Sequence, residues 1–129
     1  MNLKPIVATE LEFYLLKNGE GNVPEPLLGK IPGTQIDQPG TQYAMPEDLW
    51  DNDAFLEDVR KACEVQNVPM TTVHSEFSPG QFEINLHHVD DPVSACDHAI
   101  LLKRIVKGVA REHGMAATFM AKPFMDVPG

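Results

Sequence analysis

The stretch that decides the fold is Met70 to His88, which reads MTTVHSEFSPGQFEINLHH. Its centre, Ser78-Pro79-Gly80, is typical of a tight turn, because proline presets one backbone angle and glycine adopts conformations closed to other residues. The run after the turn alternates apolar with polar side chains, and the apolar set is Phe82, Ile84 and Leu86. Such alternation indicates a strand with one buried and one solvated face. We therefore predict a β-hairpin with strands over 70–76 and 81–88.

Further elements are predicted on both sides of this hairpin. The β-branched and aromatic run IVATELEFYLL at 6–16 predicts a first strand. Apolar residues at helical spacing predict helices over 50–66 and from about 90 to 113, and a last strand is predicted over 115–122. The order β-α-β-β-α-β predicts an α+β fold, with two helices on one face of an antiparallel sheet and the other face open. Residues 17–48, rich in proline and glycine, are expected to form a long loop.

Each predicted helix has an apolar stripe and recognisable ends. The first stripe comprises Trp50, Phe55, Val59, Ala62 and Cys63, and the second comprises Val93, Cys96, Ile100, Leu101, Ile105 and Val109. Asp51 or Asn52 is the expected N-cap of the first helix. Asp90-Asp91-Pro92 is typical of a helix start, and Gly114 suits the end of the second helix.

The composition limits the kinds of function. Ten Lys and Arg against nineteen Asp and Glu give a formal net charge of −9, which argues against binding to nucleic acid or to an anionic membrane surface. No apolar run approaches the roughly 20 residues of a membrane span, and residues 1–5 lack a signal-peptide core. Cys63 and Cys96 are expected to be buried free thiols in a reducing compartment. These features predict a cytoplasmic domain, with Glu47, Asp48 and Asp51 at a solvated helix start.

Four glutamates in the predicted strands point to a metal site. Glu10 and Glu12 lie two residues apart in the first strand and share a face, although glutamate is depleted in strands. Glu83 lies on the polar face of the returning hairpin strand, while Glu76 ends its partner, two residues after His74. Carboxylates at such spacing raise one another's pKa unless a cation lies between them. Mg²⁺ and Mn²⁺ prefer such oxygen ligands, so we predict a divalent metal site on the open face.

A simpler interpretation of the same residues is a wet sheet face. A solvated face carries polar residues at alternate positions, and some are glutamate by chance. His74 alone is interpreted as a hydrogen-bonding surface residue. Neighbours in a strand point to opposite faces, so His87 and His88 are not expected to chelate an ion together.

Three segments together resemble the glutamine synthetase family. Residues 8–15, ATELEFYL, are similar to its E-x-E-F-x-L strand, and residues 75–83, SEFSPGQFE, are similar to its E-x-x-x-(P/A)-G-Q-x-E hairpin. Residues 117–124, ATFMAKPF, are similar to its A-T-F-M-x-K-P strand. The resemblance extends over residues 1–129 as the first half of the family's catalytic domain. The strands ELEFYLL and SPGQFE resemble the branch of the γ-glutamylpolyamine synthetases.

This resemblance implies an ATP-dependent carbon–nitrogen ligase of nitrogen metabolism and glutamine biosynthesis. ATP phosphorylates the γ-carboxylate of glutamate, ammonia or an amine displaces the phosphate, and two or three Mg²⁺ or Mn²⁺ ions neutralise the transferred group. By the resemblance, Glu12, Glu76 and Glu83 are ligands of the tighter metal site and Glu10 is a ligand of the second metal. Tyr43 falls where the family has a G-x-Y element that lines the substrate channel, although here residues 40–43 read GTQY.

The sequence departs from the family pattern at both ends. It stops at Gly129, before the G-S-G-M-H motif whose histidine binds the second metal, and it lacks the downstream arginines, the later glutamate ligand and the loop that guards the site. The small N-terminal β-domain is also absent. We therefore expect a partial catalytic domain that is inactive alone, with a stand-alone metal-binding or assembly module as the alternative. Half a sheet has an unpaired edge, which predicts a homo-oligomer.

Overall fold

The structure is a computed structural model that describes residues 3–17 and 23–129, so part of the predicted long loop lies outside the described residues. The elements follow one another as β1 (Glu10–Lys17), α1 (Pro46–Asp51), α2 (Asp53–Val65), β2 (Met70–Ser75), β3 (Gln81–Leu86), α3 (Pro92–Glu112) and β4 (Met115–Thr118). The predicted α+β class and element order are confirmed, with the short helix α1 as an addition.

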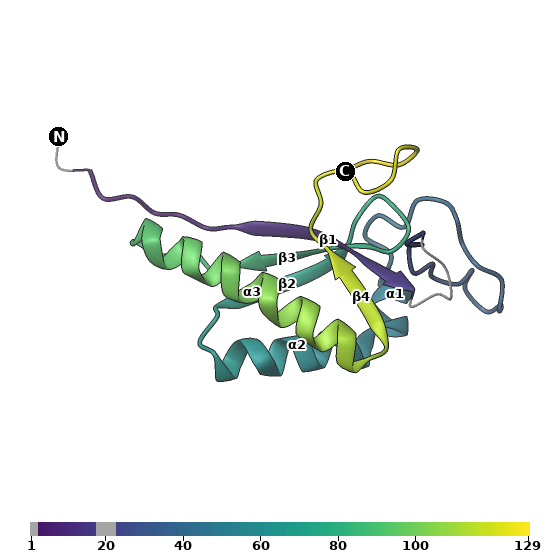
Figure 1. Cartoon of the computed structure of the whole chain (residues 1–129), viewed down its shortest axis with the longest axis horizontal. Coiled ribbons are helices and arrows are strands. Elements are labelled where there is room, and N and C mark those ends of the chain that lie inside the picture. Colours follow the sequence, from purple (N-terminus) through teal and green to yellow (C-terminus); the bar gives the residue numbers. More distant parts are fainter. Residues whose placement is uncertain (1–2, 18–22) are drawn as a thin grey trace.

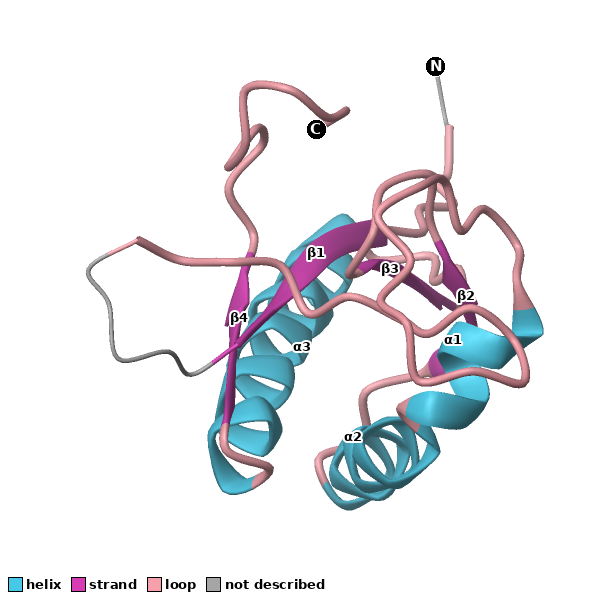
Figure 2. Cartoon of the chain, turned by 90° about the vertical axis from the view of Figure 1, so that its right-hand side faces the viewer, coloured by secondary structure: helices cyan, strands magenta, loops and turns pink. Residues whose placement is uncertain are grey.

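One antiparallel sheet organises the molecule, with its strands in the order β2-β3-β1-β4. The two long helices, α2 and α3, lie on the same side of this sheet (Figures 1 and 2). The hairpin between β2 and β3 depends on Gly80, whose φ is +75° and where a Cβ would lie 2.8 Å from the carbonyl oxygen of Leu27. Only glycine fits both conditions, so the predicted turn is a packed corner of the fold.

The core lies between the sheet and the two long helices. It includes Phe13 and Leu15 of β1, Phe82 and Ile84 of β3, Phe55 and Val59 of α2, and Leu102 and Val106 of α3. Phe82 and Ile84 are buried as the alternation predicts, and Phe13 and Leu15 lie on the face of β1 opposite to Glu10 and Glu12. Side chains on the other parity of β1 and β3, including Glu12 and Glu83, therefore belong to the opposite face of the sheet.

The predicted helix over 50–66 is in fact two helices that meet at Asn52. Phe55, Val59 and Cys63 are buried as expected, but Trp50 belongs to α1 and is 68% exposed. The prediction for Trp50 was wrong because the change of axis at Asn52 turns α1 away from the stripe that α2 presents to the sheet.

The predicted stripe of α3 was also wrong over its first half. Val93, Cys96 and Ile100 are exposed, and the buried set is Ala95, Leu102, Ile105, Val106 and Ala110. The face of Val93, Cys96 and Ile100 continues toward the C-terminus with Arg104, Lys107 and Arg111, so it cannot be buried along the whole helix. The face that stays apolar to the end packs on the sheet instead, and Cys96 is consequently a surface thiol.

The sequence signals predict the ends of α3 more accurately than the ends of the strands. Asp91 caps α3 by accepting a hydrogen bond from the Val93 backbone N–H at 3.1 Å, and Gly114 has a φ of +69° just after the helix. β1 begins at Glu10 rather than at residue 6, because only an isolated bridge between Val7 and Val89 continues the pairing. β3 and β4 also end earlier than predicted, at Leu86 and Thr118.

In the part of the chain that the structure describes, no helix has both the length and the apolar character that a membrane crossing requires.

Candidate metal centre

Strand register brings the predicted acidic residues into a row across three strands. Glu12 of β1 lies directly opposite Glu83 of β3, and Glu83 lies directly opposite His74 of β2. Directly opposed residues of an antiparallel pair have Cβ atoms about 4.5–5.5 Å apart and point to the same face. Pairing alone therefore gathers Glu12, Glu83 and His74 on the side of the sheet away from α2 and α3.

Three of these side chains converge closely at the end of the hairpin. The Nε2 atom of His74 lies 3.1 Å from Oε1 of Glu76 and 3.5 Å from Oε1 of Glu83. One ligand atom from each of His74, Glu76 and Glu83 lies within 4.8 Å of the others, a spacing suited to a common metal ion. His74, interpreted from the sequence as a surface residue, is thus part of the cluster.

Neighbouring amides hold the carboxylates in place. Gln81 donates a hydrogen bond from Nε2 to Oε2 of Glu12 at 2.6 Å, and Asn85 donates from Nδ2 to Oε1 of Glu83 at 2.9 Å. The backbone N–H of Phe77 donates to Oε2 of Glu76 at 3.1 Å. Sequence reasoning missed the roles of Gln81 and Asn85, although their position two residues either side of Glu83 was a usable signal.

The electrostatics of the cluster favour a cation. Burial raises the pKa of Glu12, and the negative charges of Glu76 and Glu83 raise it further. Among the described residues, no Lys or Arg nitrogen lies within 4.0 Å of Glu76 or Glu83, and His74 is their ion-pairing neighbour. Glu83 is buried, so its charge has little solvent to stabilise it. A divalent ion would relieve this repulsion, and the donor set fits one.

Glu10 and Tyr43 lie at the margins of the cluster. Glu10 is exposed, stands opposite Asn85 and shares the face of Glu12, at about 6–7 Å along the strand. Tyr43 is 61% exposed, on a segment held beside the end of β2 by the bond from the Ala44 backbone N–H to the Ser75 carbonyl oxygen, at 3.0 Å. Both residues therefore lie beside the cluster of His74, Glu76 and Glu83 and are not part of it.

The interpretation of two other features changes with the structure. His87 and His88 lie beyond the end of β3, so the strand rule does not apply, and their rings pack edge to face with centroids 4.6 Å apart. Asp48 was predicted at a solvated helix start, but it is buried, with 4% of its surface exposed. Its carboxylate packs against Gly29 so closely that a Cβ at that position would collide with Oδ1. Burial and the nearby acids Asp51 and Glu47 raise the pKa of Asp48 to about 6.

Comparison with known proteins places this arrangement in a family. The sequence profile of the glutamine synthetase catalytic domain matches residues 1–129. The chain belongs to the glutamine synthetase family. The resemblance inferred from the three motifs is confirmed, and the predicted branch agrees with the relatives described next.

Two relatives of this glutamine synthetase-family chain have names that describe ligases acting on amines. The chain is 42% identical over 130 residues to the gamma-glutamylputrescine synthetase PuuA of Escherichia coli K12, covering 98% of the chain and 27% of the relative. It is 34% identical over 129 residues to a glutamate–isopropylamine ligase of a Pseudomonas species, covering 100% and 27%. The chain thus spans about a quarter of the length of these relatives.

Solved structures agree on the fold. A GmaS/ADP complex superposes with a TM-score of 0.75 at 24% identity, over 96% of this chain and 26% of that chain. Ligand-free GmaS superposes with a TM-score of 0.73 at 27% identity, over 96% and 27%. The sheet that carries the carboxylate row is therefore a glutamine synthetase fold.

Proposed function

We propose that this chain provides the divalent-metal platform of an ATP-dependent ligase that joins the γ-carboxylate of glutamate to ammonia or an amine. Membership of the family and the amine ligases among its relatives support this reaction class. The observation that carries the proposal is the convergence of His74, Glu76 and Glu83, with Glu12 opposite Glu83 and no Lys or Arg paired to them among the described residues.

Each residue has a proposed role. Glu12, Glu76 and Glu83 would hold one Mg²⁺ or Mn²⁺, His74 would orient the two carboxylates it contacts, and Glu10 would contribute to a second ion. Bound divalent ions supply charge neutralisation for the phosphoryl group that ATP transfers to glutamate. The amides of Gln81 and Asn85 fix the carboxylate orientations, which is the usual contribution of groups behind metal ligands.

Tyr43 is proposed to line the channel through which the amine approaches. Its ring is exposed beside the end of β2. The next residue, Ala44, is hydrogen-bonded to Ser75, which directly precedes Glu76. Among the described residues no Lys or Arg is paired to Glu76 or Glu83, and the chain spans about a quarter of the length of its relatives, so we propose that turnover requires more than this chain. The γ-glutamylpolyamine branch makes a polyamine a better candidate acceptor than ammonia.

A chimera tests this proposal. The matching quarter of the Escherichia coli gamma-glutamylputrescine synthetase is replaced by residues 1–129, and ADP release is measured with glutamate, ATP, Mg²⁺ and putrescine. We expect amine-dependent ADP release that Glu83→Ala abolishes, whereas Glu112→Gln, an exposed glutamate at the end of α3, leaves it unchanged. A folded chimera without turnover, or an active Glu83→Ala chimera, would contradict the proposal.

A further inference from the structure

A buried glutamine joins the segment that carries Tyr43 to the hairpin of β2 and β3. Gln42 directly precedes Tyr43 in the chain, yet only 1% of its surface is exposed. Its side chain donates a hydrogen bond from Nε2 to the Gln81 carbonyl oxygen at 2.8 Å and accepts one at Oε1 from the Gly80 N–H at 3.1 Å. Both ends of the Gln42 amide are thus paired with the backbone of the hairpin turn.

Gln81 continues this connection as far as the acidic row. Its side chain donates from Nε2 to Oε2 of Glu12 at 2.6 Å and accepts at Oε1 from the Ser78 N–H at 3.2 Å. Gln81 is buried, so solvent is not at hand to replace these partners if its backbone moves. The hydrogen bonds from Gln42 to Gln81 and from Gln81 to Glu12 therefore form one continuous path. We call the pair Gln42 and Gln81 the glutamine bridge.

Tyr43 lies in a four-residue turn that is held at its base. The Met45 N–H donates to the Gln42 carbonyl oxygen at 2.9 Å, which places Tyr43 and Ala44 at the two central positions of the turn. The Oγ atom of Ser75 lies 3.0 Å from the carbonyl oxygens of both Gln42 and Met45, between which it shares its hydroxyl hydrogen. Ser75 belongs to β2, so both ends of the turn are fixed to the hairpin.

The backbone of Ala44 shows that this turn depends on its anchors. Its φ is +57°, in the left-handed region that is unfavourable for a residue with a Cβ. Such a conformation persists only where the surrounding structure holds it. The Ala44 N–H donates to the Ser75 carbonyl oxygen at 3.0 Å, and the Gln42 N–H donates to the Phe77 carbonyl oxygen at 3.3 Å. The position of Tyr43 is therefore set by the hairpin.

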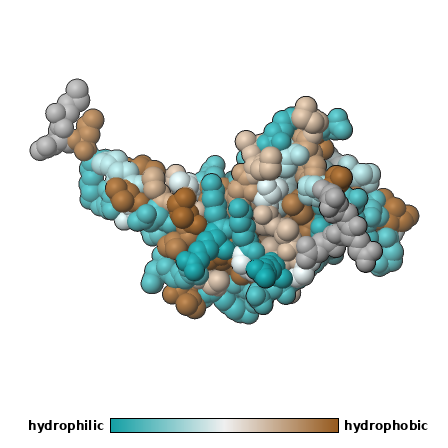
Figure 3. All heavy atoms as spheres, in the orientation of Figure 1, coloured by the Kyte–Doolittle hydropathy of each residue, from teal (hydrophilic) through white to brown (hydrophobic). Residues whose placement is uncertain are grey.

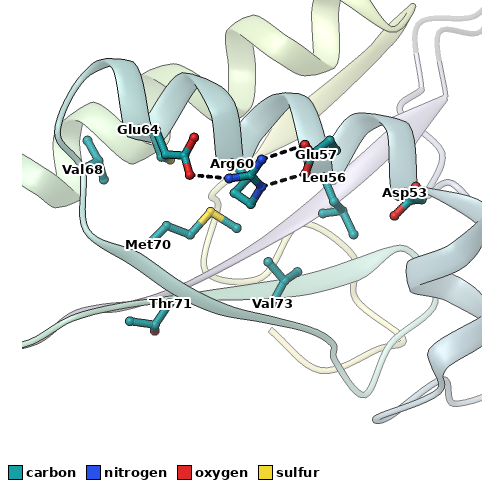
Figure 4. A pocket seen from close by; sticks show the side chains of 10 residues that line it. Asp53, Leu56, Glu57, Arg60, Glu64, Val68, Met70, Thr71 and Val73 are labelled. Atoms are coloured by element: carbon teal, nitrogen blue, oxygen red, sulfur yellow. Dashed lines mark hydrogen bonds and ion pairs between the residues drawn. The ribbon is translucent and has the colours of Figure 1, made fainter.

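Polar groups elsewhere in the molecule are paired differently. In the groove of about 320 Å³ between α2 and β2, Arg60 pairs with Glu57 and Glu64 of its own helix (Figure 4). Over α3, polar side chains project into solvent (Figure 3). The bonds of Gln42 instead are buried and join residues 38 and 39 positions apart in the sequence. Buried hydrogen bonds of this kind fix the relative positions of the segments that they join.

We propose that Gln42 is a positioning residue that fixes Tyr43 and Glu12 relative to each other through the glutamine bridge. This inference rests on the proposed function, in which Glu12 holds a divalent ion and Tyr43 lines the amine channel. An ion that binds more tightly when the bridge is intact must also stabilise the bridge, because coupling between two sites is reciprocal. Gln42 thus keeps the amine channel aligned with the metal site without touching the ion.

A purely structural role for Gln42 makes a different prediction, because a side chain that only fills space would leave Glu12 unaffected. Gln42→Met separates the two roles, since methionine has a similar length and volume but forms neither of the amide hydrogen bonds. Gln38→Met is the matched control. The side-chain hydrogen bonds of Gln38, to Thr41 and Met45, stay within the same loop.

The first measurement is nuclear magnetic resonance on the metal-free chain. We expect Gln42→Met to shift the side-chain amide signals of Gln81, the carboxyl-carbon signal of Glu12 and the backbone amide signals of residues 43 and 44. Gln38→Met should leave the Gln81 and Glu12 signals in place. Circular dichroism verifies that each variant is folded.

The second measurement is a calorimetric Mn²⁺ titration of the same variants. Gln42→Met should weaken binding by roughly three- to tenfold, less than the loss of about 10- to 100-fold that is usual when a group directly behind a ligand is removed. Gln38→Met should bind Mn²⁺ like the natural sequence.

A third measurement needs no variant and decides the question if Gln42→Met does not fold. Saturating the natural sequence with Mg²⁺ should shift the side-chain amide signals of Gln42 and the backbone amide signals of residues 43 and 44. A Mg²⁺-saturated chain in which the Glu83 signals shift and these do not would overturn the proposal.

Three further results would also overturn it. They are Gln81 and Glu12 signals that stay in place in folded Gln42→Met, an equal effect of Gln38→Met, and Mn²⁺ binding of unchanged strength in Gln42→Met. If Gln42→Met shifts the Glu12 signal but the natural sequence binds no Mn²⁺, the glutamine bridge is supported and the metal platform is contradicted. The two proposals therefore fail separately.

Discussion

At the residue scale, the buried carboxylates of Glu83 and Asp48 differ in the groups that surround them. Glu83 is surrounded by groups that suit a bound cation, namely His74 at 3.5 Å and the Asn85 amide at 2.9 Å. Asp48 has neither an ion-pairing partner among the described residues nor a neighbouring cluster of ligands, and its pKa rises to about 6. The first carboxylate has the neighbours that the proposed metal site requires, whereas the second costs stability.

Asp48 should make the stability of the chain depend on pH. Its folded pKa of about 6 exceeds the ordinary value of 3.8, so the folded state binds the proton more tightly than the unfolded state. The resulting stabilisation is complete below about pH 3.8 and is lost as the pH rises through about 6. Asp48→Asn should therefore raise the unfolding free energy at pH 7.5 by about 1–2 kcal/mol, since each pKa unit corresponds to ~1.4 kcal/mol before solvent screening.

Urea unfolding at pH 4.5 and pH 7.5 measures this effect. The gain from Asp48→Asn should fall to about a third at the lower pH, because pH 4.5 still lies above the unfolded pKa of 3.8. Glu112→Gln, at an exposed position, should show no comparable change between the two pH values. A gain that is equal at both pH values would mean that packing against Gly29, rather than ionisation, decides the outcome.

At the element scale, local signals and long-range packing differ in what they predict. The Asp91 cap, the Gly114 helix end and the Gly80 turn follow from chemistry within a few residues, and the structure confirms each. The buried face of α3 does not, because its apolar residues lie on more than one face and only the sheet selects between them. The same limit explains Trp50, which a kink at Asn52 removes from the predicted stripe.

A pair of substitutions on α3 tests which face is buried. Leu102 is 0% exposed and Ile100 is 65% exposed, although only Ile100 belongs to the predicted stripe. Leu102→Ala should lower the unfolding free energy by about 2–5 kcal/mol, the usual cost of a cavity in a core. Ile100→Ala should change it by about 0.5 kcal/mol or less. Comparable losses in both variants, measured by urea unfolding, would contradict the packing described for α3.

At the scale of the whole molecule, the sequence predicts the fold and the four glutamates Glu10, Glu12, Glu76 and Glu83, but not which of them converge. Strand parity places Glu10 beside Glu12, and the tight hairpin places Glu76 near Glu83, whereas the pairing of Glu12 with Glu83 follows only from the strand order of the structure. The part played by His74 depends on the register of β2 against β3, in which His74 pairs with Glu83 in the regular stretch next to the turn. The sequence places the imidazole on the face of Glu76, but its distances of 3.1 Å to Glu76 and 3.5 Å to Glu83 come only from the structure.

The most direct measurement of the central claim is a calorimetric titration of the chain with Mn²⁺, compared with Glu83→Gln and with Glu112→Gln. We predict saturable binding to the natural sequence, unchanged by Glu112→Gln and weakened by roughly a hundredfold in Glu83→Gln, which keeps the size of the side chain but removes its charge. Absence of Mn²⁺ binding by the folded chain, or equal binding by Glu83→Gln, would contradict the account and leave the acidic row as an ordinary solvated face.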